Sequence, residues 1–477
     1  MPLFSQILTY VLWGLYIFTT LSTIVVILLE NRNPVRSLAW LLVLLLLPGL
    51  GLLFYAAFGQ SFRQQKIIRK KTIHRDKSRN LIVSTKSALD KKKLPSSISS
   101  LAKLLLENSD AHIYEDSDIQ IYAEGQETFR ALFESMHNAK NHIHVEFFII
   151  EVDAIGYQFR DILINKAREG VEVRLIFDYW GSFGLKKSFL QPMSDAGVIF
   201  HSFLPAKFPV FAHKINYRNH RKIVVIDGKI GYLGGINIAK RYYYGDHLGA
   251  WRDTVLRFEG SAVHGLQSTF LLDWYFVGAT VEDTKKYFPK PQQFNPNRTQ
   301  IVYSGPDTDW ENIMQAIFTA VTRAEKHIYI HTPYFMPTDV ISTALQTAAL
   351  KGIDVRLMIP DKSDVWLAHF GNYSYIDEML KAGVRVFLYN DGFLHSKAIV
   401  IDDYISTVGT TNMDFRSYEQ NFEVNAFIYE KETALRLKKH FLNDIKKCEE
   451  ISPEKWNKRS KWQRLRESFA RLFSPLM

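Results

Sequence analysis

HRKIVVID, at residues 220–227, is the stretch from which the architecture of this chain can be read, because residues 395–402 repeat it as HSKAIVID. Both copies have the pattern His-x-Lys-x4-Asp. The apolar run before each aspartate is typical of a buried parallel strand, and residues two apart on a strand share one face. The repeated polar residues are His220, Lys222 and Asp227 in the first copy and His395, Lys397 and Asp402 in the second. We therefore expect one histidine–lysine site to be built twice.

The repeat extends well beyond these two motifs. Residues 142–149 correspond to residues 327–334, and residues 170–178 correspond to residues 352–360. These segments are rich in β-branched and aromatic residues, which predicts strands, and the strands that begin with glycine follow helical stretches. This alternation predicts an α/β fold made of two tandem domains that pack against each other as a pseudo-twofold unit. The first copy also contains an insertion at residues 204–217.

Further polar residues recur at matched positions after each motif. Asn237 and Asn412 lie equally far beyond their motif histidines, and each follows a turn of small residues. Lysine offers positive charge to phosphate oxygens, asparagine offers amide donors, and histidine acts as nucleophile or as acid and base. Two such sets facing each other would surround one phosphodiester. Thr410 stands where the first copy has Gly235, so we expect a hydroxyl donor from one half alone.

Bulk composition narrows the remaining chemistry. The net charge of +10 over 477 residues favours anionic partners such as phospholipid headgroups or nucleic acid. The single cysteine, Cys448, forms no internal disulfide and cannot build a cysteine-based zinc site, which fits a reducing cytosol. The sequence also lacks the HExxH and GxxxxGK patterns of zinc peptidases and P-loop proteins.

Two apolar segments precede the repeats. Residues 3–29 and 38–58 contain no charged side chain, and about 20 apolar residues span a bilayer as a helix. A signal peptide is disfavoured because no basic region precedes the first segment and no cleavage pattern follows it; a buried soluble hairpin is the alternative. Residues 61–110 are expected to form a basic linker followed by a short helix. The linker has more Lys and Arg residues than the short loop between the segments, which predicts cytoplasmic catalytic domains. Residues 1–60 are thus expected to form two transmembrane helices.

Two other segments suit contact with lipid. Residues 451–477 are basic and amphipathic, with Trp462, Leu465 and Phe469 on one helical face. A helix lying on an anionic membrane and a helix packed on the protein body both fit this pattern. The insertion at residues 204–217 is apolar, and it fits either a loop that dips into lipid or a packed loop, with the first favoured.

The two motifs resemble the HKD signature of the phospholipase D superfamily. Two apolar segments, a basic linker and two motif copies together resemble the bacterial cardiolipin synthases over essentially the whole chain. The resemblance also rests on RNHRKI at residues 218–223, Gly228, YFMP at 334–337 and GTTNMDFRS at 409–417. It implies two phospholipase D-like domains, at residues 111–290 and 291–450, in a multi-pass protein of the bacterial cell membrane.

The resemblance also implies a reaction and its residues. Two phosphatidylglycerol molecules would give cardiolipin and glycerol through a phosphatidyl-histidine, with phosphatidylglycerol and anionic lipids as partners and with no metal or organic cofactor. His220 is then the nucleophile and His395 the acid and base. The predicted catalytic set is the six motif residues, although in this superfamily the aspartate tends to stabilise local structure. Asp253 and Glu423 are the candidates for orienting the histidines.

Other functions fit parts of the same pattern. A membrane-bound hydrolase of the phospholipase D type would use the same residues with water as acceptor, and it is the main alternative. A nuclease gains nothing evident from two membrane spans, so we expect no nucleic-acid partner. A scaffold with decayed motifs is disfavoured because the histidines, lysines and asparagines are intact in both copies.

Overall fold

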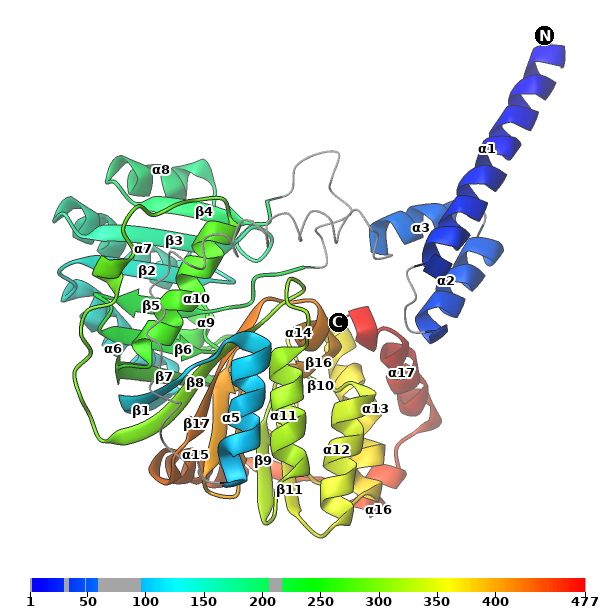
Figure 1. Cartoon of the computed structure of the whole chain (residues 1–477). Coiled ribbons are helices and arrows are strands. Elements are labelled where there is room, and N and C mark those ends of the chain that lie inside the picture. The colour runs from blue at the N-terminus through cyan, green and yellow to red at the C-terminus, as the bar shows by residue number, and fades with distance from the viewer. Residues whose placement is uncertain (1, 30–33, 48, 59–95, 206–216, 477) are drawn as a thin grey trace. The chain divides into compact units, whose positions relative to one another are not determined.

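The computed structural model describes residues 2–29, 34–47, 49–58, 96–205 and 217–476 (Figure 1). The chain divides into two compact units: residues 1–73 with 206–216, and residues 74–205 with 217–477. Most of the predicted basic linker and most of the predicted apolar insertion lie outside the described residues. The second unit contains both repeats.

The N-terminal unit contains three described helices: α1 (Pro2–Leu29), α2 (Pro34–Leu46) and α3 (Leu50–Phe58). Of the helices in the described ranges, α1 alone is long and apolar enough to cross a membrane. The second predicted span, residues 38–58, is interrupted between α2 and α3. Gly49 has a φ of +77°, a conformation that favours glycine and ends a helix. One long apolar helix is therefore observed in place of two.

Helix α5 (Ser96–Ser109) lies in the segment predicted as a linker, yet it is part of a core. Ile98, Leu101 and Leu105 repeat at helical spacing and are buried in the core of the second repeat. The side chain of Gln300 in β8 (Pro296–Ser304) donates a 3.1 Å hydrogen bond to the Ala102 carbonyl. The C-terminal end of the predicted linker thus belongs to the catalytic body.

The two repeats place corresponding strands and helices in the same order. In the first repeat these are β1 (Ile113–Glu124), α6 (Gly125–His137), β2 (His142–Phe147), α7 (Ala154–Arg168), β3 (Glu172–Asp178), α8 (Lys187–Asp195), β4 (Ile199–Phe203), β5 (Ile223–Ile226), β6 (Ile230–Gly234), β7 (Trp251–Gly260) and α10 (Val263–Phe276). In the second they are β8, α11 (Asn312–Thr322), β9 (His327–His331), α12 (Asp339–Leu350), β11 (Asp354–Pro360), α13 (Trp366–Lys381), β12 (Arg385–Tyr389), β14 (Ala398–Ile401), β15 (Ile405–Gly409), β17 (Glu423–Tyr429) and α15 (Lys431–Ile445). The predicted duplication is therefore visible element by element.

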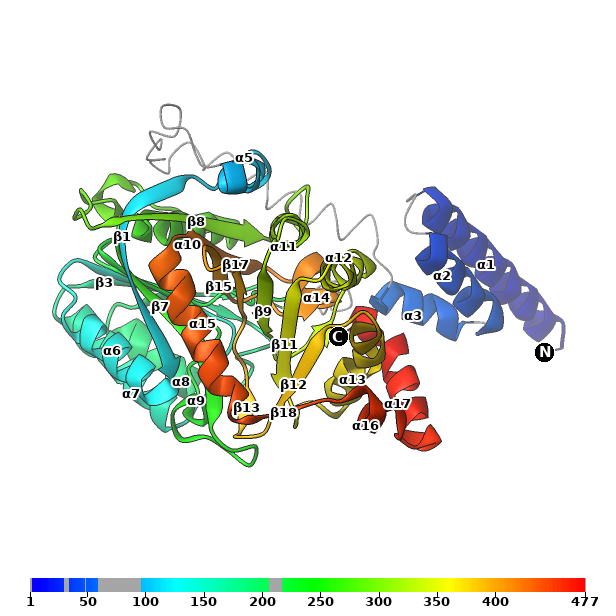
Figure 2. The ribbon, with the colours of Figure 1, turned by 90° about the horizontal axis from the view of Figure 1, so that it is seen from below.

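The strands of both repeats join in one 16-stranded sheet (Figures 1 and 2). Fifteen strands follow the order β18-β12-β11-β9-β14-β15-β17-β8-β1-β7-β6-β5-β2-β3-β4, where β18 (Cys448–Glu450) is an added edge strand. The sixteenth, β13 (Phe393–Leu394), pairs with β7 outside this order. Apart from β18, corresponding strands stand at mirrored positions on either side of the antiparallel β8–β1 pair. The repeats therefore meet edge to edge, in a pseudo-twofold arrangement.

The motif strands differ from the parallel strands that the sequence predicts. β5 pairs antiparallel with β2 and β6, and β14 pairs antiparallel with β9 and β15. The prediction of burial is confirmed, since all residues of both strands are buried. Ile223 and Val225 enter a core shared by both repeats, while Val224 and Ile226 enter the first repeat's own core. An apolar run indicates that both faces of a strand are buried, but it does not indicate the direction of the strand.

Candidate active site

Each histidine motif begins on extended chain just before its strand and is hydrogen-bonded to the opposite repeat. The amide of His220 donates to the Phe422 carbonyl at 2.9 Å, and the amide of His395 donates to the Arg252 carbonyl at 2.7 Å. In the second copy this pairing forms the short strand β13 (Phe393–Leu394), which runs parallel to β7. The sheet of one repeat thus fixes the histidine of the other.

The carboxylates that contact the histidines are also exchanged between the repeats. The Nδ1 atom of His220 lies 2.9 and 3.0 Å from the two carboxylate oxygens of Glu423 in β17. The Nδ1 atom of His395 lies 2.7 Å from a carboxylate oxygen of Asp253 in β7. Both carboxylates are buried. A carboxylate at Nδ1 favours the tautomer whose Nδ1–H donates to it, which leaves the Nε2 lone pair of each ring available.

A contact and the electrostatics both indicate that the two copies meet. The hydroxyl of Ser396, between His395 and Lys397, lies 2.7 Å from the hydroxyl of Thr254 in the first repeat. Burial, the nearby charges of Lys397 and Lys222, and His220 hold the pKa of His395 well below its usual range. Burial lowers the pKa of His220 to about 4, opposed by Glu423. Charges act strongly on one another only over short distances. The structure therefore brings His220, Lys222, His395 and Lys397 together, with both imidazoles neutral at pH 7.

The two lysines are buried and supply a positive site. The Lys222 ammonium donates to the His220 carbonyl at 2.6 Å, and the Lys397 ammonium donates to the His395 carbonyl. Burial lowers the pKa of Lys222 to about 7 and that of Lys397 to about 8. A phosphodiester anion between these ammonium groups would stabilise their charged forms and reduce their mutual repulsion.

The motif aspartates are not brought to this site. They follow the last residue of β5 and β14, five residues along the chain or roughly 16 Å from the lysines. Their carboxylates accept backbone N–H bonds of 2.6 to 3.0 Å at the start of a neighbouring strand, from Lys140, Asn141 and His142 for Asp227 and from Glu325, Lys326 and His327 for Asp402. Their φ values of +54° and +53° place both in the left-handed region. The geometry gives them a role in fixing turns and strands, so it does not support their place in the predicted catalytic set.

The two asparagines, predicted as equivalent phosphate donors, have different surroundings. The Asn237 side chain accepts from the Ile149 amide at 3.1 Å and donates to the Tyr242 hydroxyl at 2.7 Å. Asn412 lines a cavity beside His220, and its buried Oδ1 has no hydrogen-bond partner among the described residues. Asn412 is thus the amide that faces the site from one side.

The hydroxyl of Thr410, predicted as a donor available from one half, is directed to a carboxylate. It donates to Glu423 at 2.5 Å, next to the His220 contact. At the matched Gly235, a Cβ atom would lie 2.3 Å from the Asp253 carboxylate. Thr410 therefore supports Glu423, and the first repeat needs glycine because Asp253 fills the corresponding space.

Buried arginines hold the backbone beneath both carboxylates, which the sequence did not reveal. Arg221 donates to the Glu423 carbonyl at 3.1 Å and pairs with Asp273 of α10. Arg252 donates to the Asp253 carbonyl and pairs with Asp444 of α15 at 2.9 Å. The place of Arg221 between His220 and Lys222 could have marked it as a functional residue. Its ion pair could not be predicted in the same way, because Asp273 lies in a helix about 50 residues further along the chain.

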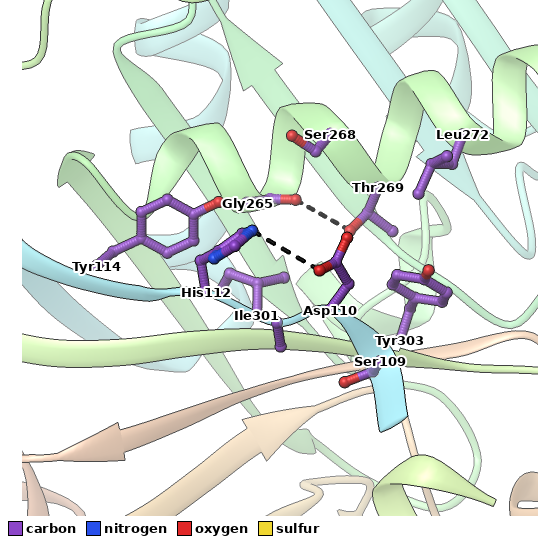
Figure 3. Close-up of a pocket in the computed structure, with 11 residues that line it drawn as sticks. Ser109, Asp110, His112, Tyr114, Gly265, Ser268, Thr269, Leu272, Ile301 and Tyr303 are labelled. Carbon is purple, nitrogen blue, oxygen red and sulfur yellow. Dashed lines mark hydrogen bonds and ion pairs between the residues drawn. The ribbon is translucent and has the colours of Figure 1, made fainter. Parts of the chain in front are cut away.

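A cavity of about 400 Å³ opens beside His220. Its apolar and aromatic lining consists of Phe148, Tyr334, Met336, Val365 and Ala368. The polar lining includes Arg218, His220, Asn412, Asp414, Arg416 and Asn421. Figure 3 shows a smaller cavity of about 70 Å³ between the start of β1 and α10, where His112 and Asp110 lie 3.8 Å apart, and no motif residue lines it. Among the described residues there is no group of three or more potential metal-ligating side chains.

Two α/β repeats that each bring a histidine and a lysine to one shared site define a phospholipase D-like protein. A family model described as "Cardiolipin synthase, PLD-like domain" matches residues 132–248 and 317–445, and one described as "Phospholipase_D-nuclease N-terminal" matches residues 17–60. The chain belongs to the family of phospholipase D-like cardiolipin synthases.

Sequence similarity to cardiolipin synthases extends along nearly the whole chain. The chain is 40% identical to a cardiolipin synthase of Alkalihalophilus pseudofirmus over 466 residues, covering 96% of this chain and 93% of that protein. It is 38% identical to a cardiolipin synthase of Listeria monocytogenes serotype 4a over 480 residues, covering 99% and 100%. The crystal structure of phosphatidylserine synthase from Haemophilus influenzae has a TM-score of 0.60 at 15% identity, over 80% of this chain and 100% of that one, which shows a shared fold.

Proposed function

We propose that the chain is a membrane-bound cardiolipin synthase that converts two phosphatidylglycerol molecules into cardiolipin and glycerol by reversible phosphatidyl transfer. The observation that carries this proposal is the meeting of two histidine–lysine pairs, each histidine with a carboxylate from the opposite repeat. The adjoining cavity, whose lining includes both apolar and charged side chains, suits a lipid phosphodiester.

The first half of the reaction uses His220 as nucleophile. Glu423 holds its Nδ1–H, so Nε2 attacks phosphorus and the bond from phosphorus to the glycerol oxygen breaks. His395, oriented by Asp253, gives a proton to the leaving glycerol. The anionic substrate raises the pKa of His395 toward the range in which it carries that proton. Lys222 and Lys397 stabilise the charge that spreads over the phosphoryl oxygens.

The second half reverses these roles. His395 takes the proton of the primary hydroxyl of a second phosphatidylglycerol, whose oxygen attacks the phosphatidyl-histidine. The bond between phosphorus and His220 breaks, and cardiolipin leaves. Because glycerol and the second lipid use the same proton carrier, the transfer runs in both directions.

We infer a multi-pass anchor in the bacterial cell membrane with cytoplasmic catalytic domains. The length and composition of α1 support one span, and the apolar residues 38–58, although interrupted, supply the second. The excess of Lys and Arg after residue 60 supports the orientation. In this proposal residues 1–60 form the anchor, residues 61–110 form a linker that ends in the packed helix α5, and residues 111–290 and 291–450 form the two catalytic domains.

Residues 451–477 have features of both alternatives that the sequence left open. Helix α17 (Lys461–Leu472) packs on α13, and Arg471 pairs with Glu378 at 2.5 Å. Its opposite face exposes Trp462 (74%), Leu465 (58%), Phe469 (52%) and Leu472 (76%). Because α13 also lines the cavity through Ala368, we propose that this apolar face lies in the membrane surface near the lipid entrance.

The experiment is to give purified protein phosphatidylglycerol in bilayers and to identify the products. Cardiolipin and free glycerol in equal amounts support the synthase. Phosphatidic acid as the dominant product would overturn it in favour of a hydrolase. A variant with His220→Ala is the negative control for both outcomes.

A further inference from the structure

The cavity beside His220 is lined by two arginines, one from each repeat. Arg218 lies two residues before His220, and Arg416 lies four residues after Asn412. The carbonyl of Arg218 accepts from the Phe422 amide at 2.8 Å, and that of Arg416 accepts from the Asn421 amide at 2.8 Å. The backbones of the two arginines are therefore held by successive residues of one segment, next to the carboxylate that orients His220.

The two arginines lie close enough for each charge to act on the other. Burial, followed by the charge of Arg416, lowers the pKa of Arg218 to about 10, and burial also lowers the pKa of Arg416. The acidic groups that act on Arg416 are Asp414, Asp178 and Glu423. Asp414 shares the cavity, but its carboxylate accepts the Ser417 amide at 2.6 Å and burial raises its pKa to about 6. Two partly buried guanidinium groups at one cavity favour an anion between them.

The proposed reaction needs two phosphodiesters at once, and the histidine–lysine site holds one of them. The acceptor lipid places its hydroxyl at the phosphorus on His220, while its own phosphate stays three carbons away. Arg218 is two residues from His220 on extended chain, a separation of roughly 6.6 Å between Cα atoms. This separation is comparable with the reach of a glycerol bridge between two phosphates.

We propose that Arg218 and Arg416 bind the phosphodiester of the second, acceptor phosphatidylglycerol. The inference rests on the proposed synthase function and adds a second phosphate subsite to it. A guanidinium has five N–H donors, so Arg218, whose Nη1 donates to the Tyr217 carbonyl at 2.9 Å, and Arg416 can still offer donors to phosphate oxygens. Phe148, Met336 and Val365, in the apolar lining of the same cavity, then contact the glyceride part of that lipid.

The test compares two acceptors that differ in having a phosphate. One assay measures cardiolipin formed from phosphatidylglycerol in bilayers. The other measures exchange of labelled free glycerol into phosphatidylglycerol, which uses the same donor and the same histidines but an acceptor without phosphate. For Arg218→Gln and Arg416→Gln we expect cardiolipin formation to fall by about tenfold or more, while glycerol exchange stays within about threefold of the unaltered protein.

Controls separate this inference from the function on which it rests. Arg160→Gln, in α7 beside Asp161 and outside the cavity lining, should change neither assay. Arg218→Lys and Arg416→Lys keep the charge and lose the fork, so an intermediate loss of cardiolipin formation is expected. Retained exchange also shows that a variant is folded.

Two results would overturn the proposal. An equal fall in both assays would mean that the arginines bind the donor phosphate or stabilise the fold. Unchanged rates in both assays would mean that the arginines bind neither lipid. Failure of the synthase function has a different signature, because the unaltered protein would then form no cardiolipin from phosphatidylglycerol.

Discussion

The two histidine sites share a topology but differ in what surrounds each ring. His220 lines the cavity, and among the described residues its one aromatic ring neighbour is Phe148, with ring centroids 5.1 Å apart. His395 is enclosed by the rings of Trp251, Tyr242 and Phe393, with centroids at 5.4, 5.5 and 5.9 Å. The duplication therefore gives both histidines the same backbone setting, and a few neighbouring side chains make their surroundings different. Both rings are buried, with 8% of His220 and 6% of His395 exposed, so the difference lies in their neighbours. A ring at the wall of a cavity suits attack on a lipid phosphorus, whereas a ring packed among aromatic side chains suits proton transfer.

The largest expected effect comes from removing either histidine. His220→Ala and His395→Ala should each lower cardiolipin formation by about 10⁴-fold or more, because nucleophile and proton carrier act as one unit. The comparison becomes sharper with a phosphatidyl ester of p-nitrophenol, a leaving group that needs no proton. His395→Ala should then still form labelled phosphatidyl-enzyme, whereas His220→Ala should not. The reverse pattern would exchange the two roles, and unchanged thermal unfolding controls for folding.

The next effect concerns the exchanged carboxylates. Glu423→Gln and Asp253→Asn should each lower turnover by roughly 10² to 10³-fold, since an amide can donate to Nδ1 and favour the wrong tautomer. Because Glu423 serves His220 and Asp253 serves His395, only the Asp253 variant should recover the initial release of p-nitrophenol from the ester, since the second half still needs His395. The exposed Glu127→Gln of α6 is the matched control. Equal recovery of both variants would contradict the cross-repeat pairing.

A smaller effect is expected from pH. Burial lowers the pKa of Lys222 to about 7 and that of Lys397 to about 8, so free enzyme loses these positive charges as pH rises through that range. We expect kcat/KM for phosphatidylglycerol to fall by up to about tenfold per pH unit above pH 8. The kcat value should fall less, because bound phosphate holds the lysines protonated. A profile of kcat/KM that stays flat to pH 10 would exclude this role for the lysines.

The smallest effects test the position where the copies differ. Gly235→Ala places a Cβ against the Asp253 carboxylate, so a loss of about tenfold in turnover is expected from a displaced His395 partner. Thr410→Val removes the hydroxyl bond to Glu423 and should cost about threefold to tenfold. Initial rates of cardiolipin formation measure both. A larger loss for the threonine variant would mean that Glu423 depends on this hydroxyl more than the geometry indicates.

Much of the architecture was predictable from local patterns. The paired strands 142–149 and 327–334, and the glycine-initiated strands after them, appear as β2, β9, β3 and β11 because β-branched runs need only local chemistry and burial to form strands. Strand direction in β5 and β14 was predicted wrongly, since burial on both faces is common to parallel strands and to antiparallel strands between two cores. The second membrane segment was predicted from length and composition, and neither measures the interruption near Gly49.

The site was predictable in its parts and less so in its connections. Asp253 and Glu423 were named from their positions, but which histidine each one contacts depends on β7 and β17 receiving the motif of the other repeat. Arg218 and Arg416 stood inside recognised stretches without any sign that they line one cavity, because almost two hundred residues separate them in the sequence. The distinct surroundings of Asn237 and Asn412 were likewise hidden, since a repeat shows equal spacing and not equal contacts.

The amino-acid sequence alone determined that this chain is a duplication with two His-x-Lys-x4-Asp motifs, since a repeat and its spacing are properties of a linear string. It also determined the chemical types available, namely imidazole, ammonium, amide and carboxylate. The tertiary structure decided which carboxylate orients which imidazole, that the motif aspartates fix turns, and that His220 lines a cavity while His395 packs among three aromatic rings. These outcomes depend on strands of one repeat hydrogen-bonding to the other, and contacts across such sequence distances are set by the packed core as a whole.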